Sequence, residues 1–479
     1  MANFISKAIM VTAAYAYGLY TMVAWGWLFI RRGTFFKKRT EKEHLELQLA
    51  RDRLWNLSND FSGLSHHFVT LPSGFKFHFV SNHAPGSTGA LSSDKPLVIF
   101  IHGFPDSWAV WRHIISSPDL QNDAAVVAID LPGYGGTQTL SRYSTTNVLE
   151  RLTELILTLR VQYGVDPGDK TNQKKVTIVA HDWGCLLTMR LAAEAPMLAH
   201  RFIISNGPLP ALVMSNMRRL WLSARKMFHT ALASPLHARA PLKQALHTLG
   251  PIFRQIASSS YVFTINLPLP MVRFFLTGGN HSFMTTVHKM GAGEGPFTPL
   301  EAADSMASSM GPSSAESKTQ TAEGDTYPTT STYDVDFGNI LHSAHYYRVA
   351  TGITHWRKSI ETVTALHSIA DGNVTRRTSS GAGLFDEAAP GVLNASTTIF
   401  WGQRDPALDP GMCLDGIRDF LVRDSQVVML PESAHWTPTE PASRKAILAA
   451  VQWSVNGEKE DIEAVVQATY PSAKVTVRR

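Results

Sequence analysis

Three titratable residues have the types and surroundings of a covalent hydrolytic site. Asp182 lies in the segment AHDWGC, Asp405 in FWGQRDPAL and His435 in LPESAHW. A carboxylate that attacks a saturated carbon forms an alkyl ester, which water activated by a histidine can hydrolyse. A serine in that place would leave a stable ether. The sequence therefore predicts Asp182 as the nucleophile, His435 as the general base, and Asp405 as the acid that orients and supports His435.

Each of these residues also has an ordinary structural alternative. Asp182 could cap the N-terminus of the following helix, which is a common position for aspartate. Asp405 could be a turn residue before Pro406, and His435 could stand at the start of a helix. The three occur in the order nucleophile, acid, base, and each follows a predicted strand. Ligand-facing residues gather at the carboxyl ends of parallel strands, so their coincidence there favours the catalytic interpretation.

Short apolar runs that fit strands buried on both faces of a parallel sheet precede these residues. They alternate with helical patterns such as residues 147–163, and this alternation predicts a doubly wound, mostly parallel α/β sheet. The predicted strands are a half-buried Phe75–Val80, then Leu97–Ile101, Ala124–Ile129, Val176–Val179, Phe202–Ile204, Thr397–Trp401 and Gln426–Leu430. A last helix is expected over about Ala442–Trp453.

The strand that ends at Val179 turns into a helical segment, Leu186–Ala195, with small residues around the turn. A nucleophile at such a turn has a strained backbone, and its side chain must stand clear of both elements, so its neighbours must be small. This is the pattern of the nucleophile elbow in the α/β-hydrolase fold. At its apex this sequence has Asp182 instead of serine.

The segment HGFP, which follows the predicted strand 97–101, occupies the place of an oxyanion-hole loop. The backbone N–H groups of Phe104 and Trp183 are expected to point at a developing oxyanion. His102, Gly103 and Pro105 are expected to support this loop, and Pro105 is a candidate for a cis peptide bond.

The motifs HGFPDSW, DLPGYGGT, AHDWG and SAHW together resemble those of the epoxide hydrolases of the α/β-hydrolase fold, over about residues 75–453. The resemblance implies an inserted helical lid with two tyrosines that donate hydrogen bonds to the epoxide oxygen. The candidates are Tyr261, in YVFTINLPLP, and Tyr347, in HYYRV, with the adjacent Tyr346 as the alternate. Simple packing within an aromatic lid is the alternative for each tyrosine.

The expected reaction is hydrolysis of a small hydrophobic epoxide to a vicinal diol through an ester on Asp182, without metal or organic cofactor. Opening the ring releases an alkoxide that needs a proton donor, and a tyrosine hydroxyl with a pKa near 10 suits that role. A haloalkane dehalogenase shares the aspartate, acid and histidine but holds its halide on N–H donors, for which the Trp183 indole is a candidate. A catalytically silent, membrane-anchored binding protein is the other alternative, which the intact catalytic set disfavours.

The N-terminal segment has no charged residue from Ala8 to Ile30, which is long enough to cross a bilayer core of about 30 Å. A basic flank follows where a signal peptide would have a small-residue cleavage site; a buried soluble helix is a further alternative. The excess of basic residues after the segment predicts that the catalytic part is cytoplasmic. We expect a single-pass anchor, in the endoplasmic reticulum, with the sequons at Asn56, Asn280, Asn373 and Asn394 unused.

Composition is that of an ordinary globular protein, with 44% hydrophobic and 17% charged residues among 479. Part of the net charge of +5 comes from the basic flank of the anchor, so no nucleic-acid partner is expected. Two cysteines cannot form a disulfide framework.

The predicted organisation places the two parts of the hydrolase core on either side of a helical lid. Its parts are an anchor with basic flank (1–39), an amphipathic, solvated linker helix (40–60), the first part of the core (61–208), the lid (209–393), the second part of the core (394–457) and a tail (458–479). The Ser/Thr-rich stretch of about 302–332 and residues 371–390 are expected to be loops or disordered.

Overall fold

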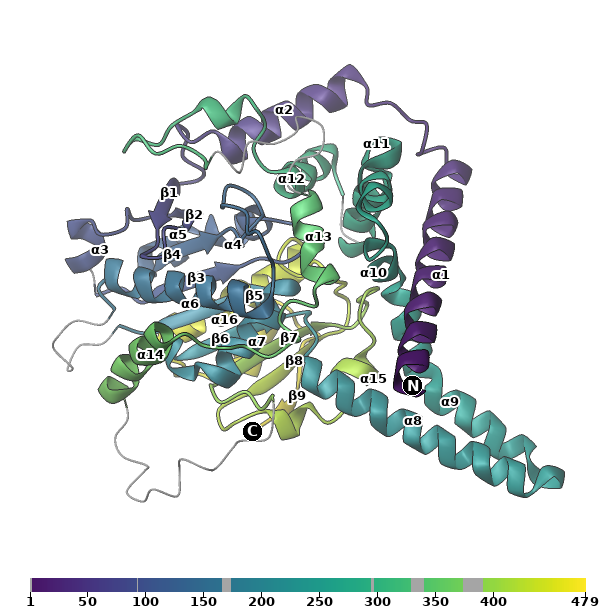
Figure 1. The fold of residues 1–479 in the computed structure, drawn as a ribbon. Helices are drawn as coiled ribbons and strands as arrows, with labels where there is room; N and C mark the ends of the chain where they lie inside the picture. Colours follow the sequence, from purple (N-terminus) through teal and green to yellow (C-terminus); the bar gives the residue numbers. More distant parts are fainter. Residues whose placement is uncertain (1, 93, 166–173, 294–296, 329–339, 374–390) are drawn as a thin grey trace.

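A nine-stranded sheet forms the centre of the molecule, with the strand order β1-β2-β4-β3-β5-β6-β7-β8-β9 (Figure 1). The computed structural model describes residues 2–92, 94–165, 174–293, 297–328, 340–373 and 391–479. The strands are β1 (Ser65–Thr70), β2 (Lys76–Ser81), β3 (Leu97–Ile101), β4 (Ala125–Ile129), β5 (Val176–His181), β6 (Arg201–Ser205), β7 (Thr397–Gly402), β8 (Gln426–Leu430) and β9 (Lys474–Arg478).

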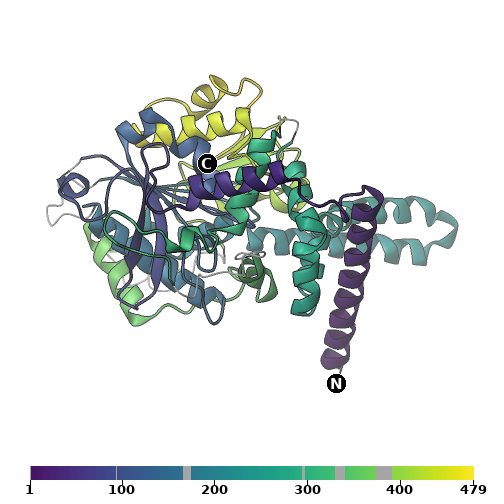
Figure 2. The same ribbon diagram turned by 90° about the horizontal axis from the view of Figure 1, so that it is seen from above.

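Strands β3 to β8 are parallel to one another, whereas β1 pairs with β2, β2 with β4, and β9 with β8 in antiparallel fashion. Helices cover both faces of the sheet, with α16 and α17 on one side and α14 on the other (Figure 2). This is the α/β-hydrolase fold that the sequence predicted. Every residue of β3, β4, β5, β6, β7 and β8 is buried, which explains why these strands are apolar without alternation.

The predicted strands all occur, with bounds that differ by at most two residues at each end. Phe75–Val80 is more deeply buried than expected, since Phe77, Phe79 and Val80 of β2 have no exposed surface. Two edge strands were not predicted. The sequence of β1, SHHFVT, is half polar, and β9 alternates exposed and half-buried residues within a tail that has little apolar content.

The helices outside the insertion between β6 and β7 frame the sheet. They are α1 (Ala2–Arg31), α2 (Glu41–Trp55), α3 (Thr88–Ser92), α4 (Arg112–Ile115), α5 (Pro118–Asp123), α6 (Thr145–Gln162), α7 (Trp183–Glu194), α15 (Pro410–Cys413), α16 (Pro441–Val455) and α17 (Ile462–Gln467). The inserted helices are α8 (Pro210–Ala233), α9 (Arg239–Ser258), α10 (Ser260–Ile265), α11 (Leu269–Gly291), α12 (Pro299–Met310), α13 (Ile340–Arg348) and α14 (Ile360–Asn373).

The expectation of a loop over residues 302–332 was wrong for its first part, because residues 302–310 belong to α12. The buried side chains of α12 are small or flexible, chiefly alanine, serine and methionine. Such residues let a helix approach its neighbours closely, but their composition resembles that of a disordered segment. Of the second stretch, residues 371–373 end α14, and residues 374–390 lie outside the described part of the chain.

Helix α2 has the predicted bounds but is not solvated on all sides. It packs against α12, where the Trp55 indole donates to the Ala307 carbonyl oxygen at 2.9 Å and Arg53 pairs with Asp304. Leu47 and Leu54 are buried as well. Leu47, Leu54 and Trp55 therefore form a contact face, whereas Leu45 and Leu49 are exposed, and α2 joins the N-terminal segment to the inserted helices.

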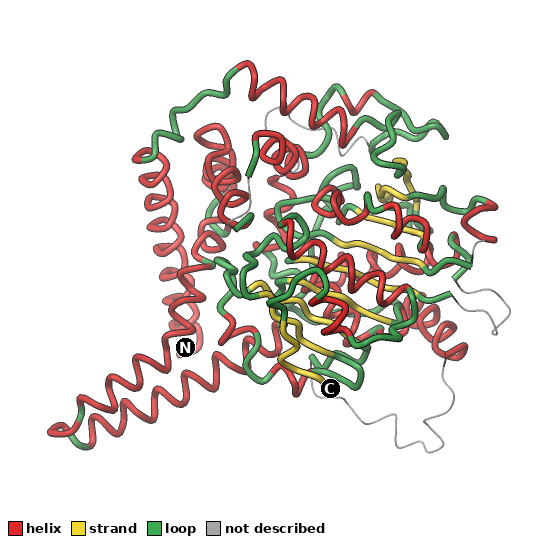
Figure 3. Tube along the Cα trace, turned by 180° about the vertical axis from the view of Figure 1, so that it is seen from behind, coloured by secondary structure: helices red, strands yellow, loops and turns green. Residues whose placement is uncertain are grey.

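Helix α1 contains the apolar stretch, and residues 8–31 are long and apolar enough to cross a membrane by length and composition. Signal sequences and core helices can share these properties, but only 11% of the most apolar window is buried. One side of α1 packs on α10 and α11 (Figures 1 and 3). The Thr264 hydroxyl donates to the Gly18 carbonyl at 3.2 Å, and Trp25 meets the Phe283 ring edge to face.

Candidate active site

Asp182 stands at the turn between β5 and α7, with φ of 52° and ψ of −117°. A non-glycine residue with positive φ is strained and is retained where the surroundings enforce it. Gly184 permits this turn, because a Cβ there would lie 2.6 Å from the carbonyl oxygens of Ile101 and His102. The Asp182 side chain makes no capping hydrogen bond to α7.

The HGFP loop brings backbone donors to the Asp182 carboxylate. The Phe104 N–H donates to Oδ1 at 2.6 Å, and the Trp183 N–H also bonds to this carboxylate. The Phe104–Pro105 peptide bond is cis, as the sequence suggested. A Cβ at Gly103 would lie 2.5 Å from the Asp182 Cβ, so only glycine allows the loop to come this close. The two predicted oxyanion donors therefore converge on one carboxylate.

His102 connects this loop to the segment after β4. Its Nδ1 is 2.9 Å from the Gly103 carbonyl oxygen, and its Nε2 accepts the Leu131 N–H at 2.9 Å. Burial lowers the pKa of His102, which keeps the ring neutral and Nε2 available as an acceptor. His102 thus supports the position of the loop and does not face the reacting carboxylate with a free nitrogen.

His435 lies between the two predicted carboxylates. Its Nδ1 is 2.7 Å from Asp405 Oδ2, and its Nε2 is 3.5 Å from Asp182 Oδ2. Asp405 is fully buried, and its other hydrogen bonds come from the Asn206 amide at 2.7 Å and from the N–H groups of Ala407 and Leu408. These donors compensate the burial of the Asp405 charge and fix the carboxylate that orients His435.

The charges in this row depend on one another. Burial alone would lower the pKa of His435, but the Asp405 charge and the hydrogen bonds that His435 donates to Asp182 and Asp405 raise it to about 10. Burial would conversely raise the pKa of Asp182, but the hydrogen bond and charge of His435 outweigh burial and lower this pKa. The site therefore holds an imidazolium between two carboxylates, with Asp182 ionised.

This electrostatic arrangement predicts a pH dependence of stability. The pKa of His435 is higher in the folded protein than the usual value near 6.5, so its contribution to stability is complete below pH 6.5 and is lost as the pH rises through about 10. The free energy of unfolding of the wild type should exceed that of His435→Gln by an amount that shrinks between these pH values, on the order of a few kcal/mol. Denaturant unfolding of both proteins from pH 6 to 10 measures this difference in the free energy of unfolding. A difference that stays constant over this pH range would contradict the prediction.

Two tyrosines from the inserted helices cover Asp182. Tyr261, on α10, and Tyr347, on α13, have hydroxyl oxygens 3.3 Å apart, and the Tyr347 ring packs edge to face on Phe104 and Trp183. Burial raises the pKa of both hydroxyls, and the negative charge of Asp182 raises it further, so both remain protonated donors. Tyr346 is buried elsewhere, and its hydroxyl donates to the Pro132 carbonyl at 3.0 Å.

A small cavity of about 70 Å³ joins Asp182 and His435 to Tyr261. Its other walls are mostly apolar. They are Trp25, Phe104, Ser258, Phe283, Val287, Met290, Pro406, Ala407 and Trp436. Trp25 belongs to α1, so the apolar N-terminal helix contributes directly to the wall around the catalytic residues.

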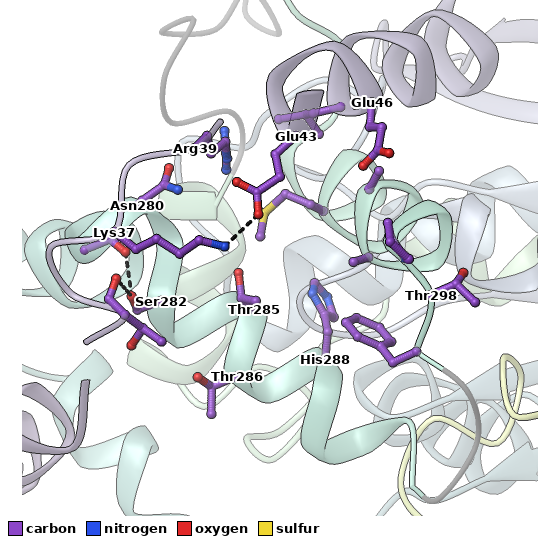
Figure 4. Close-up of a pocket in the computed structure, with 18 residues that line it drawn as sticks. Lys37, Arg39, Glu43, Glu46, Asn280, Ser282, Thr285, Thr286, His288 and Thr298 are labelled. Carbon is purple, nitrogen blue, oxygen red and sulfur yellow. Dashed lines mark hydrogen bonds and ion pairs between the residues drawn. The ribbon is translucent and has the colours of Figure 1, made fainter. Parts of the chain in front are cut away.

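A larger pocket of about 360 Å³ lies apart from the catalytic residues, between the segment after α1 and helices α2, α11 and α12 (Figure 4). Its lining mixes polar and apolar side chains, and Lys37 and Glu43 form an ion pair across it at 2.7 Å. None of the predicted site residues lines this pocket. Its size alone does not make it the candidate site, because Asp182 and His435 line the smaller cavity.

Two residues of the site were not predicted. Asn206 comes directly after β6, with φ of 51°, and holds both Asp405 and the Gly402 N–H. Its position at a strand end in SNGP was a usable signal. Trp25 had no such signal, because an aromatic residue within an apolar N-terminal run suggests an interfacial anchor and not a pocket wall.

Comparison with known proteins gives matches to part of the chain. Residues 96–235 match the alpha/beta hydrolase fold family. Epoxide hydrolase 4 of Mus musculus is 31% identical over 155 residues, 32% of this chain and 38% of that protein. Epoxide hydrolase 3 of Mus musculus is 26% identical over 200 residues, 41% of this chain and 40% of that protein. These alignments thus span about two fifths of the relatives' own length.

Among solved structures, the epoxide hydrolase of Bacillus megaterium in complex with an inhibitor superposes with a TM-score of 0.48. The sequence identity is 21%, and the superposition covers 81% of this chain and 99% of that one.

Proposed function

We propose that this chain, which has the α/β-hydrolase fold and is related to the epoxide hydrolases, opens a hydrophobic epoxide to a vicinal diol. The observation that carries the proposal is the pair of hydroxyls, Tyr261 and Tyr347, which lie 3.3 Å apart and close enough to Asp182 for its charge to raise the pKa of both. An aspartate nucleophile suits displacement at carbon, and two protonated donors suit a leaving oxygen that stays attached to the substrate.

The reaction begins when Asp182 attacks one epoxide carbon. The carbon–oxygen bond of the ring breaks, and the alkoxide accepts hydrogen bonds and then a proton from the tyrosine pair. Asp182 is now an alkyl ester. Water that has lost a proton to His435 attacks the ester carbonyl, and the N–H groups of Phe104 and Trp183 stabilise the tetrahedral oxyanion. The diol leaves, and Asp182 returns to its ionised form.

Loss of the negative charge on Asp182 makes His435 a base once the ester has formed. While Asp182 is ionised, it helps to keep His435 protonated. Ester formation removes that negative charge and leaves Asp405 as the remaining carboxylate partner, so the pKa of His435 falls. The imidazolium can then release its proton toward the alkoxide through the tyrosines and become the neutral base that the second step needs.

Formation of diol from an aryl epoxide tests the proposed function. The purified full chain is expected to convert the epoxide, and the inactive Asp182→Ala protein provides the background rate. Release of halide from a haloalkane without turnover of the epoxide would instead identify a dehalogenase. Absence of either activity in a folded protein would favour a binding role.

The tyrosine pair provides a more specific prediction. Tyr261→Phe and Tyr347→Phe should each lower kcat by about 10- to 100-fold, because one donor remains, and the double variant by about 10²- to 10⁴-fold. Tyr346→Phe is the matched control, since its hydroxyl bonds to Pro132 and not over Asp182. It should cost about 1 kcal/mol of stability and leave kcat within about twofold. Steady-state rates with one epoxide measure all four, and equal losses in Tyr346→Phe and Tyr347→Phe would refute the assignment.

We propose further that α1 anchors the chain in a membrane, that of the endoplasmic reticulum with the catalytic part cytoplasmic, and that the substrate is lipophilic. Supporting this are the apolar outer side of α1 and the basic residues that follow it. Trp25 of α1 lines the cavity that contains Asp182 and His435, so the proposed anchor contacts the proposed reaction site.

Two glycines of α1 test whether its packing matters for catalysis. A Cβ at Gly18 would lie 2.5 Å from the Phe263 carbonyl oxygen, whereas a Cβ at Gly26 has no atom within 4 Å. Gly18→Leu should therefore push α1 away from α10, displace Trp25, and lower kcat/KM for a lipophilic epoxide by about 10-fold. Gly26→Leu should leave kcat/KM unchanged. Both proteins can be assayed in the same detergent, and equal rates for the two would show that α1 is only a tether.

A further inference from the structure

Helices α8 and α9 form an arm, residues 210–258, that projects from the body of the molecule (Figures 1 and 3). The arm contacts α15 and α10 at its base. Farther out, the two helices pack on each other through a small apolar cluster of Ala224, Ala245 and Leu249, which is separate from the main core. None of the predicted catalytic residues lies on the arm. Its surface, however, has features that could bind a partner.

The charge of the arm is of one sign. Residues 210–258 contain no aspartate or glutamate. Their seven basic side chains are all exposed: Arg218, Arg219, Arg225, Lys226, Arg239, Lys243 and Arg254. At the base, Arg254 pairs with Asp409 at 2.6 Å and Arg219 with Asp415 at 3.4 Å. Of the other five, Arg225, Lys226, Arg239 and Lys243 lie farther along the arm than these pairs, so the arm offers a positive surface to an anionic partner.

The same surface carries large apolar side chains. Trp221 is 58% exposed, Leu232 76%, and Leu236, at the tip between the helices, 96%. Met214, Trp221 and Leu232 are seven and eleven residues apart, so they share one face of α8. Leu242, Leu246 and Phe253 share one face of α9 by the same rule. Arg218 and Arg225 border the first stripe, and Lys243 borders the second.

We propose that the arm binds the surface of an anionic lipid bilayer. Apolar stripes bordered by cations fit a bilayer interface, where the apolar side chains enter the headgroup region and the cations meet phosphates. A nucleic-acid partner would use the cations but leave Leu232 and Leu236 in water. The arm is a second membrane contact besides α1, and it orients the catalytic part relative to the bilayer. This inference does not depend on the reaction proposed above.

The test uses the full chain reconstituted in vesicles, with an environment-sensitive fluorophore on Leu236→Cys. Both native cysteines, Cys185 and Cys413, are buried and should not react. In vesicles of phosphatidylcholine and phosphatidylserine, the emission should shift to the blue, and spin-labelled lipid should quench it. The control label at Val161→Cys, 70% exposed on α6, should be quenched by iodide and not by the lipid.

A charge-reversed protein, Arg225→Glu/Lys226→Glu/Lys243→Glu, tests the electrostatic part. Lipid quenching at the tip should fall at least about threefold, and high salt should weaken it in the parent protein. Circular dichroism and thermal unfolding show whether the variant is folded. Iodide quenching at the tip equal to that at position 161 would overturn the proposal. So would shielding that grows with protein density without lipid quenching, since that indicates contact with a second protein.

Discussion

Replacing Asp182 by alanine is expected to lower kcat by about 10⁴-fold or more, because the covalent step has no other nucleophile. The elbow positions this carboxylate, and the N–H groups of Phe104 and Trp183 bind it. No other carboxylate lines the cavity among the described residues, since Asp405 stands behind His435. Steady-state diol formation measures the loss, and Asp182→Asn, which keeps the shape of the side chain, shows whether the fold survives. A variant that keeps more than about one hundredth of the wild-type rate would rule out Asp182 as nucleophile.

Isotopic labelling distinguishes an ester on Asp182 from direct attack of water on the epoxide. In a single turnover in ¹⁸O-labelled water, hydrolysis at the ester carbonyl leaves the label in the Asp182 carboxylate, and the diol keeps oxygen from the unlabelled protein. Mass spectrometry of the peptide containing Asp182 should therefore show the label after one turnover. Label that enters the diol directly, with an unlabelled peptide, would mean that water attacks carbon and that Asp182 acts only by its charge.

The catalytic row could be predicted from the sequence because its members are marked by local context. Asp182 is framed by small residues at the end of an apolar strand, and Asp405 and His435 each follow such a strand. Topology then brings strand ends together, so separations of more than two hundred residues did not matter. Tyr347 could be separated from Tyr346 only with the structure, since neighbours on a helix point about 100° apart and the sequence does not fix which faces the site.

What the sequence could not predict depends on contacts between distant surfaces. Residues 302–310 looked like a flexible Ser/Thr-rich stretch, but they form the close-packed face of α12 against α2. The placement of Trp25 depends on Gly18, which lets α1 approach the backbone of α10. Neither contact has a periodic signature, because a small residue is compatible with a helix interface, a turn or disorder. The apolar character of α1 was visible in the sequence, but its place beside the candidate site was not.

Replacing His435 by glutamine should stop turnover after the first step and lower steady-state kcat by about 10³- to 10⁵-fold. Loss of His435 removes the main influence that lowers the pKa of Asp182, but the Phe104 N–H still donates to this carboxylate, so attack on the epoxide should slow without stopping. The variant should also fold, because Asp405 retains three donors, from Asn206, Ala407 and Leu408. Without a base for water the ester persists, and the intact protein should gain the mass of one epoxide.

The adduct separates two roles that His435 could have. If it acts as the base in the second step, His435→Gln accumulates about one equivalent of ester, and His435→Gln/Asp182→Ala accumulates none. If the imidazolium were needed mainly to deliver a proton in ring opening, His435→Gln would be inactive without any adduct. The pairing of His435 with both carboxylates favours the first outcome. The tyrosine pair supplies the hydrogen bonds for ring opening, and loss of the Asp182 charge makes the histidine basic only after the ester has formed.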